Sequence, residues 1–279
     1  KRQVLVCSTG MIGVQLPQEK LFAGIDTALS SLESGPVDSL ARAIMTTDSK
    51  PKIASYEKDG WSIVGIAKGA GMLAPSLATM LVVLMTDAVI DEDPLSEVTS
   101  RTFDRIDSDG CTSTNDTVSL LASGASGIKP SAEDFAAALE KVCNELARGL
   151  IADAEGHTKV IRINTVHAAS EADAVAVGRA VARNNLFKCA ITGEDPNWGR
   201  ILAAVGTTHA IFDASEIDLY INGVRLCHRS SPDQPRDLVN MSDVLVEVVI
   251  DLNAGKSEAT IWTNDLSAMY VHENSAYST

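Results

Sequence analysis

Apolar residues recur along the chain with two different periods, one typical of helices and one typical of strands. Intervals of three and four predict helices, and short runs rich in β-branched residues predict strands. The predicted helices are residues 18–31, 37–45, 131–154 and 170–184, with two more beginning at Asp93-Pro94 and Asp195-Pro196. The predicted strands are residues 3–7, 53–56, 62–66, 79–87, 159–166, 186–192, 216–221, 224–227, 244–252 and 259–263.

This order of elements predicts an α+β protein. Helices and strands do not alternate regularly, as they would around a purely parallel sheet. Turn residues between strands 53–56 and 62–66, and the pair Asn222-Gly223, indicate antiparallel hairpins. We therefore expect antiparallel or mixed sheets that are covered by helices.

The most informative stretch is residues 68–87, KGAGMLAPSLATMLVVLMTD. It begins as a flexible Gly-rich loop and changes at Thr79 into a continuous apolar run, which fits a strand that is buried on both faces. On these residues alone, two interpretations of Thr79 remain open. It either begins a buried strand, as β-branched residues often do, or it serves as a nucleophile at the entrance to that strand.

The second interpretation needs a base, because a Thr hydroxyl is a weak nucleophile until its proton is removed. If the chain is cut between Ala78 and Thr79, the freed α-amine of Thr79 can be that base. Such an amine has a reference pKa of roughly 7.7–8.0, so it is partly neutral near physiological pH. The small side chain of Ala78 leaves room for the hydroxyl to attack the preceding carbonyl.

Other polar positions also carry two interpretations. Lys68 can hold a substrate carboxylate or simply be solvated, and the phosphate-loop motif G-x-x-x-x-G-K-[ST] is absent. Glu155, at a Gly turn after helix 131–154, can bind an ammonium group or solvate the helix end. The S-T-G of residues 8–10 is either an ordinary turn or a source of donors for an oxyanion.

Composition excludes several classes of function. The net charge of −14 disfavours nucleic acid and anionic membrane surfaces as partners. No apolar run approaches the ~18 residues of a membrane span. The five cysteines form no C-x-x-C pair, and the polar run 107–117 lacks the spacing of a calcium loop, so we expect no metal site, no disulfide framework and a reducing, cytoplasmic location.

The run KGAGMLAPSLATML closely resembles the self-cleavage segment of the ornithine acetyltransferase family, also called glutamate N-acetyltransferase. Further similar segments are STGMIG, AIMTTDSKPK, EGHTK, GEDPNWGRI and the tail DLSAMYVHENSAYST. The resemblance covers essentially the whole chain. It implies a layered sandwich of helices and mixed sheets with a smaller C-terminal α/β domain, which we divide into an acyltransferase core at 1–156 and a C-terminal domain at 157–279. It also implies that the natural chain begins before Lys1.

The resemblance also assigns roles to individual residues. Thr79 becomes the nucleophile after cleavage of the Ala78–Thr79 bond, and Thr9 and Gly10 form the oxyanion hole. The substrate contacts that it implies are Thr46 or Thr47, Lys68, Thr79, Glu155, Asn274 and Thr279. In the polar run 107–117, Cys111 stands where the family usually has Asp. We expect Asn115 and Asp116 only to position the residues that contact the substrate, without contacting it themselves.

The activity implied is transfer of the acetyl group of N-acetylornithine to glutamate, in arginine biosynthesis, through an acetyl-Thr79 ester and ping-pong kinetics. No cofactor is expected, and acetyl-coenzyme A stays open as a second acetyl donor. The two cleaved chains are expected to assemble as a heterotetramer. Two alternatives remain: a related self-processing amidase or aminopeptidase that passes the acyl group to water, and an uncut binding protein without catalysis.

Overall fold

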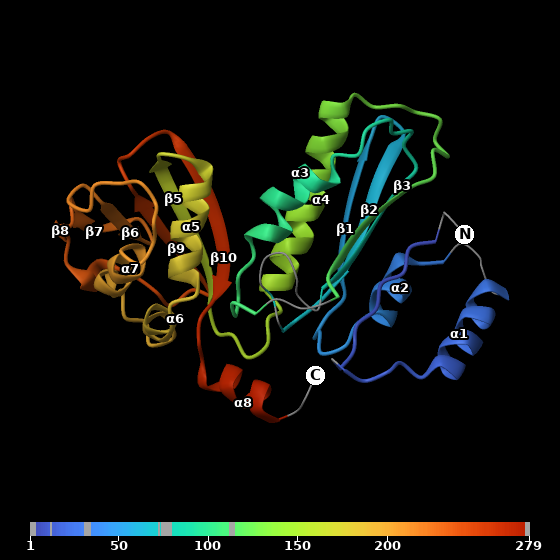
Figure 1. Cartoon of the computed structure of the whole chain (residues 1–279), viewed down its shortest axis with the longest axis horizontal. Helices are drawn as coiled ribbons and strands as arrows, with labels where there is room; N and C mark the ends of the chain where they lie inside the picture. Colours follow the sequence, from blue (N-terminus) through green and yellow to red (C-terminus); the bar gives the residue numbers. More distant parts are fainter. Residues whose placement is uncertain are drawn as a thin grey trace.

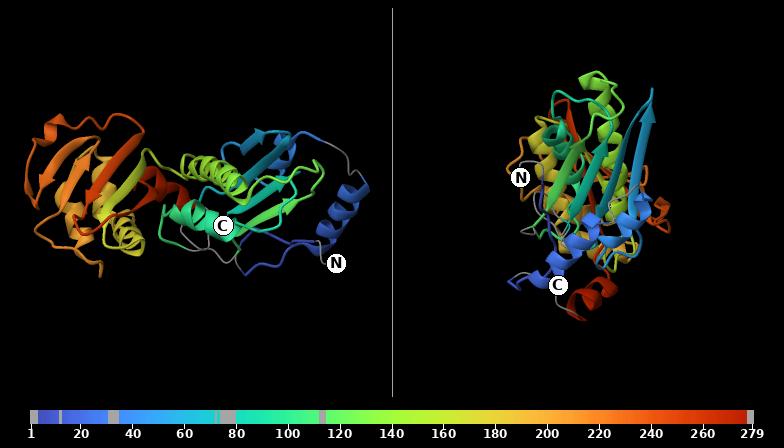
Figure 2. Two further views of the ribbon diagram at one scale, coloured as in Figure 1. Left: turned by 90° about the horizontal axis from the view of Figure 1, so that it is seen from above. Right: turned by 90° about the vertical axis from the view of Figure 1, so that its right-hand side faces the viewer.

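The computed structural model contains two halves that lie side by side along the long axis of the molecule, with α1 at the end farthest from the second half (Figures 1 and 2). It describes residues 4–11, 13–30, 35–71, 73, 80–111 and 115–276. Ala78, Thr79 and Thr279, which carry predicted roles, lie outside the described residues.

The first half is built on a four-stranded mixed sheet in the order β1-β2-β3-β4. Its strands are β1 (Lys52–Lys58), β2 (Trp61–Lys68), β3 (Leu81–Thr86) and β4 (Thr117–Ala122). Strand β2 is antiparallel to both β1 and β3, whereas β3 and β4 run parallel, with Leu81 opposite Thr117. Met80 and Asp116, each one residue before its strand, therefore lie at the same edge of the sheet.

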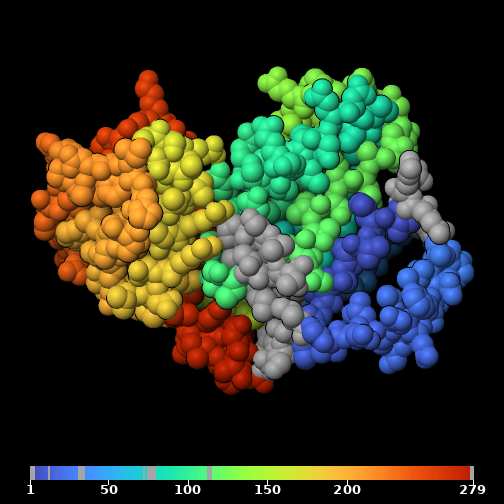
Figure 3. All heavy atoms as spheres, in the orientation of Figure 1, coloured from blue at the N-terminus to red at the C-terminus, as the bar shows by residue number. Residues whose placement is uncertain are grey.

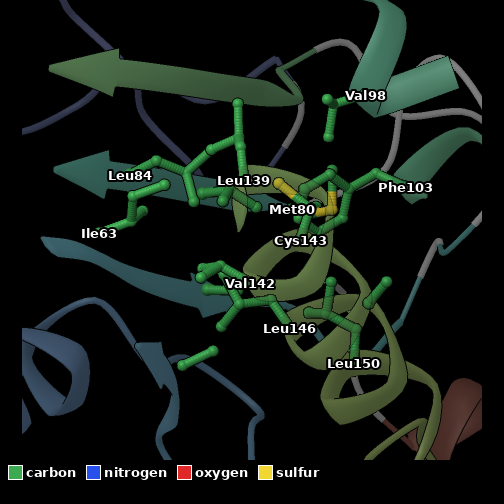
Figure 4. Packing of buried hydrophobic residues seen from close by; sticks show 14 of the residues in the cluster. Ile63, Met80, Leu84, Val98, Phe103, Leu139, Val142, Cys143, Leu146 and Leu150 are labelled. Atoms are coloured by element: carbon green, nitrogen blue, oxygen red, sulfur yellow. The ribbon is translucent and has the colours of Figure 1, made fainter. Parts of the chain in front are cut away.

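A long helix covers the first sheet and supplies more of its core than any other element in the described part of the chain. The helices of this half are α1 (Gln18–Ser30), α2 (Val37–Ala43), α3 (Leu95–Arg101), α4 (Ala132–Ile151) and the 3-10 helix η1 (Phe103–Arg105). Leu139 and Leu146 of α4 pack toward Ile63 of β2 and Leu84 of β3, as Figure 4 shows. The Ser131 hydroxyl begins α4 by accepting a hydrogen bond from the Asp134 N–H at 3.0 Å, as the sequence predicts.

The second half is built on a six-stranded mixed sheet in the order β10-β5-β9-β6-β7-β8. Its strands are β5 (Val160–Ala168), β6 (Asp218–Ile221), β7 (Val224–His228), β8 (Ser231–Pro232), β9 (Leu245–Asp251) and β10 (Ser257–Asn264). Strands β5 and β9 are parallel, and the other neighbours are antiparallel. Asn222 and Gly223 both have positive φ, as the predicted type I′ hairpin turn requires.

Helices pack on the second sheet and complete a separate core. They are α5 (Glu171–Ala182), α6 (Asn185–Thr192) and α7 (Trp198–Val205), followed in the chain by the 3-10 helix η2 (Arg236–Leu238) and α8 (Ala268–Ala276). Val177, Ile191 and Val205 of these helices are buried in one cluster with Ile163 and Ile261 of the sheet. The halves join where the Asp107 N–H donates to the carbonyl oxygen of Trp262 at 2.8 Å.

The predicted fold class is confirmed, because both sheets are mixed and both carry helices. One sheet precedes residue 156 and the other follows it, and the division into two functional domains at that residue stays a prediction. No helix in the described part of the chain is both long and apolar enough to cross a bilayer.

The predicted strand at 186–192 is wrong, because these residues form helix α6. The Asn184 side chain accepts a hydrogen bond from the Phe187 N–H at 2.9 Å and so caps the helix. Phe187, Ala190 and Ile191 then fall on one buried face at helical spacing. A short apolar run does not by itself distinguish a buried strand from a buried helix.

Two smaller expectations also need correction, and one predicted helix has an exposed apolar face. Residues 4–7 form no strand, and their apolar side chains are exposed. Helix α1 forms where predicted, but its apolar face is open, with Phe22 58% and Leu29 61% exposed. The predicted caps Asp93 and Asp195 each lie one or two residues too early, since α3 begins at Leu95 and α7 at Trp198.

Candidate active site

The Gly-rich loop after β2 is tied to the T-T-D segment by one buried carboxylate. Asp48 accepts hydrogen bonds from the Gly69 N–H at 2.7 Å and from the Thr46 N–H at 3.1 Å. Thr46 and Thr47 remain exposed to solvent. Two segments that lie about twenty residues apart in the chain, each with a predicted substrate contact, are thus held together.

Asp48 belongs to a buried charged cluster with Lys52 and Asp153. The Lys52 ammonium lies 2.6 Å from a carboxylate oxygen of each Asp, and the three side chains are 0–5% exposed. Burial alone raises the pKa of Asp48, but the N–H groups of Gly69 and Thr46 and the Lys52 ammonium outweigh it, so that the pKa lies below its usual range. The cluster fastens the turn after α4, which contains Asp153, to the start of β1.

Glu155 lies directly against the Gly-rich loop. Its N–H donates to the carbonyl oxygen of Ala70 at 2.8 Å. A methyl group added at Gly71 would lie 2.8 Å from the Glu155 carboxylate, so the loop needs glycine there to admit the side chain. The arrangement places an acid beside the predicted substrate-binding loop.

Lys68 is a second buried cation of this region, with only 1% of its surface exposed. Burial lowers the pKa of its ammonium, while the charges of Asp48, Asp116 and Glu155 oppose that shift. Lys68 and Glu155 therefore offer opposite charges close to each other, which suits a ligand that carries both a carboxylate and an ammonium group.

The S-T-G segment approaches the same region through Asn115. The Asn115 amide donates to the Ser8 carbonyl oxygen at 3.1 Å and to its hydroxyl at 3.3 Å. The Thr9 hydroxyl oxygen is buried and, among the residues that the structure describes, has no hydrogen-bond partner. A hydroxyl in that position has its proton available for a bound group.

Asp116 contacts the backbone immediately after the predicted nucleophile. Its carboxylate accepts a hydrogen bond from the Met80 N–H at 2.8 Å. Burial raises the pKa of Asp116 to about 7, against the opposing effects of that N–H and of Lys68. Met80 and Asp116 also form part of the wall of a pocket of about 400 Å³, together with Asp93 and Asp104.

The C-terminal tail returns to the turn that carries Glu155. The Ser267 hydroxyl donates to the Gly156 carbonyl oxygen and accepts from the Tyr270 N–H at 3.0 Å, so the start of α8 lies against that turn (Figure 1). Burial raises the pKa of Tyr270 to about 12, with Asp109, Cys111 and Glu155 adding to the shift. Asn274 lies farther along α8, exposed, and its amide donates to the Tyr270 carbonyl oxygen.

Comparison with known proteins identifies the family of the chain. The model of the ArgJ family matches residues 1–279. The chain belongs to the ArgJ family. Relatives include the arginine biosynthesis bifunctional protein ArgJ of Streptomyces avermitilis, 56% identical over 99% of this chain and 73% of that protein, and that of Mycobacterium leprae, 48% identical over 99% and 70%.

A solved member of the ArgJ family has a similar fold. The crystal structure of arginine biosynthesis bifunctional protein ArgJ from Bacillus halodurans matches with a TM-score of 0.65 and 32% sequence identity. The match covers 70% of this chain and 98% of the solved chain.

The structure brings together many, but not all, of the predicted site residues of this ArgJ-family chain. Thr46, Lys68 and Glu155 surround the Gly-rich loop, and Asn115 links the segment that contains Thr9 and Gly10 to the neighbouring strand β4. Ala78, Thr79 and Thr279 lie outside the described residues, and the roles of all these residues stay predictions. The larger groove of about 960 Å³ between the two halves, visible as a hollow in Figure 3, has none of them in its wall.

Sequence analysis missed the parts of the site that hold the others in place. It gave no role to Asp48, Lys52 or Asp153, and it treated Asp116 only as a support. Asp48 belongs to the T-T-D segment that the family resemblance already marked. Nothing in the local pattern indicates that Lys52 is buried, because a Lys at the start of a strand is usually solvated.

Gly156→Ala is expected to displace the tail from the Glu155 turn. Gly156 has φ +61°, and an added methyl carbon would lie 2.3 Å from the Tyr270 nitrogen, which belongs to the backbone and cannot move aside alone. Hydrogen exchange should become faster in α8 than in wild type, with little change in the middle of α4. Gly193→Ala is the matched control, because its φ is −83° and no atom lies closer than 3.6 Å. Unchanged exchange in α8 would show that the tail does not depend on this contact.

Proposed function

We propose that this ArgJ-family chain transfers the acetyl group of N-acetylornithine to glutamate in arginine biosynthesis. As a member of the family, it is an acyltransferase. The observation that carries the proposed reaction is the placement of the buried Lys68 and of Glu155 at the Gly-rich loop that precedes Thr79 in the chain, a loop that Asp48 ties to Thr46.

The charges of the loop suit both substrates. Each is an amino acid with a carboxylate that Lys68 can hold. Glu155 can accept hydrogen bonds from an ammonium group, and the exposed Thr46 or Thr47 can add a hydroxyl contact. One pocket can therefore bind the acetyl donor first and the acceptor afterwards.

The reaction has two halves. The Thr79 hydroxyl oxygen attacks the acetyl carbonyl carbon of N-acetylornithine while the α-amine of Thr79 takes the hydroxyl proton. The Thr9 hydroxyl and the Gly10 N–H stabilise the oxyanion. The carbon–nitrogen bond breaks, ornithine leaves with that proton, and an acetyl-Thr79 ester remains. The glutamate amine then attacks the ester, which releases N-acetylglutamate and the free hydroxyl.

Self-cleavage at Ala78–Thr79 would fit the lengths of the chains. The crystallised Bacillus halodurans chain is matched almost completely by 70% of this chain, and the segment from Thr79 to Thr279 makes up nearly the same share. A cleaved ArgJ chain would have that length. We include cleavage, a heterotetramer of the two products and a cytoplasmic location in the proposal, and leave acetyl-coenzyme A as a candidate second donor.

The test is an assay on the purified full-length protein combined with its intact mass after denaturation. We expect two fragments, the second beginning with Thr79, and formation of N-acetylglutamate from N-acetylornithine only when glutamate is present. Rapid release of acetate without glutamate would instead favour the self-processing amidase. An uncut chain without turnover would contradict the proposal, and replacing N-acetylornithine with acetyl-coenzyme A tests the second donor.

A further inference from the structure

Asp116 holds the backbone N–H of Met80, the residue that follows Thr79 in the chain. The Met80 nitrogen lies 2.8 Å from the carboxylate oxygen that accepts this hydrogen bond. Asp116 is itself fixed, because strand β4, which begins at Thr117, runs parallel to β3 with Thr117 opposite Leu81. The carboxylate therefore has a defined position relative to Met80, the residue that follows the proposed nucleophile in the chain.

The backbone nitrogen of Thr79 is close to that of Met80 because only two bonded carbon atoms separate them. Two consecutive backbone nitrogens are joined through one Cα and one carbonyl carbon, so they lie only ~3 Å apart. A carboxylate that accepts a hydrogen bond from the second nitrogen is thus close enough to act electrostatically on the first. Once the chain is cut, that first nitrogen is the α-amine that must accept the proton of the Thr79 hydroxyl.

We propose that Asp116 is a positioning residue for Thr79, which orients the peptide after the nucleophile and supplies the negative charge that sets the basicity of the Thr79 α-amine. This inference rests on the proposed function and adds to it a residue that controls the proton acceptor. Asp116 does not need to contact either substrate.

The surroundings make the charge of Asp116 sensitive to pH. It faces Lys68 at the end of β2 and Asp104 of η1, and Asp93 lines the same pocket. Burial raises the pKa of Asp116 to about 7, so its charge changes over nearly the same pH range as an α-amine with a reference pKa of roughly 7.7–8.0. Negative charge on Asp116 favours the ammonium form of Thr79 and so raises the pKa of that amine.

Asp116→Asn removes the negative charge but keeps the hydrogen bond, because the amide oxygen can still accept from the Met80 N–H. We expect the pKa of the Thr79 α-amine to fall by at least about half a unit, since one nearby negative charge is lost. We expect the acidic limb of the kcat/KM profile to move to lower pH by the same amount. With a weaker base, kcat should fall by up to about threefold at its plateau for each half unit of pKa lost, while KM changes little.

The control is Asp93→Asn, which removes a negative charge from the same pocket without touching the Met80 N–H. The α-amine pKa is measured directly, by the pH dependence of acetic anhydride labelling of the Thr79 terminus in the cleaved protein, followed by mass spectrometry. This readout does not depend on turnover. An Asp116→Asn protein that is cleaved but has the amine pKa and pH profile of wild type would overturn the inference alone. A wild-type chain that is never cut would overturn it together with the proposed function.

Discussion

Replacing Thr79 with alanine is expected to leave the chain uncut and to lower acetyl transfer by at least about 1,000-fold, the scale of loss seen when a nucleophile is removed. The hydroxyl that attacks both the Ala78 carbonyl and the acetyl group is missing in this variant. The intact mass and the rate of N-acetylglutamate formation measure the two losses separately.

Thr79→Ser is the matched control for that experiment, because it keeps a hydroxyl on the same carbon. We expect it to be cleaved and to retain measurable transfer, although the loss of the methyl group frees the side-chain rotamer and slows both steps. Full transfer by the uncut Thr79→Ala protein would exclude an acetyl-Thr79 intermediate.

Lys52→Met is expected to destabilise the protein by about 3–5 kcal/mol, because it leaves two buried carboxylates without their common partner. The Lys52 ammonium lies 2.6 Å from both Asp48 and Asp153. Chemical denaturation measures the loss, and the uncut Thr79→Ala background keeps unfolding a one-chain reaction. Lys50→Met, at an exposed position two residues away, should change the free energy of unfolding by no more than about 0.5 kcal/mol.

The same cluster has an expected pH dependence. Because the pKa of Asp48 lies below its usual range in the folded protein, its stabilisation is present above its unfolded pKa of about 4 and is lost as the pH falls through the folded value. Lys52→Met removes the ion pair, so its free energy of unfolding should fall less steeply in acid than that of wild type. If Lys52→Met lowers the free energy of unfolding at neutral pH by no more than Lys50→Met does, the buried ion pair makes no net contribution to stability.

Much of the fold follows from sequence pattern because the informative segments are long or are bounded by residues typical of helix caps and turns. Helix α4 has an apolar face over five turns and a Ser131 cap, and the hairpin at Asn222-Gly223 has residues that adopt positive φ. Helix α6 was mistaken for a strand because eight residues are too few to establish a period. The open face of α1 could not be foreseen either, since periodicity identifies the residues that share a face and not what covers it.

The candidate site likewise contains residues that the sequence predicts and residues that only the folded chain shows. Lys68 and Glu155 were found because they lie in distinctive motifs, and both lie at the Gly-rich loop. Lys52 and Asp153 were missed because they meet across a hundred residues of sequence, and only the folded chain shows that they pair. The position of Asp116 depends on the parallel register of β3 and β4, which no local pattern determines.

The pairing of β2 with β3 has a consequence for the protein after cleavage. Lys68 pairs with Leu81 and Ile63 with Thr86, so the proposed cut lies between two strands that remain hydrogen-bonded along their length. Helix α4, on the later fragment, packs on β1 and β2 of the earlier one. Each half of the proposed heterotetramer would then itself be a complex of two peptides. Its denaturation midpoint should rise more steeply with protein concentration than that of the uncut precursor, in which the same strands and helix belong to one chain.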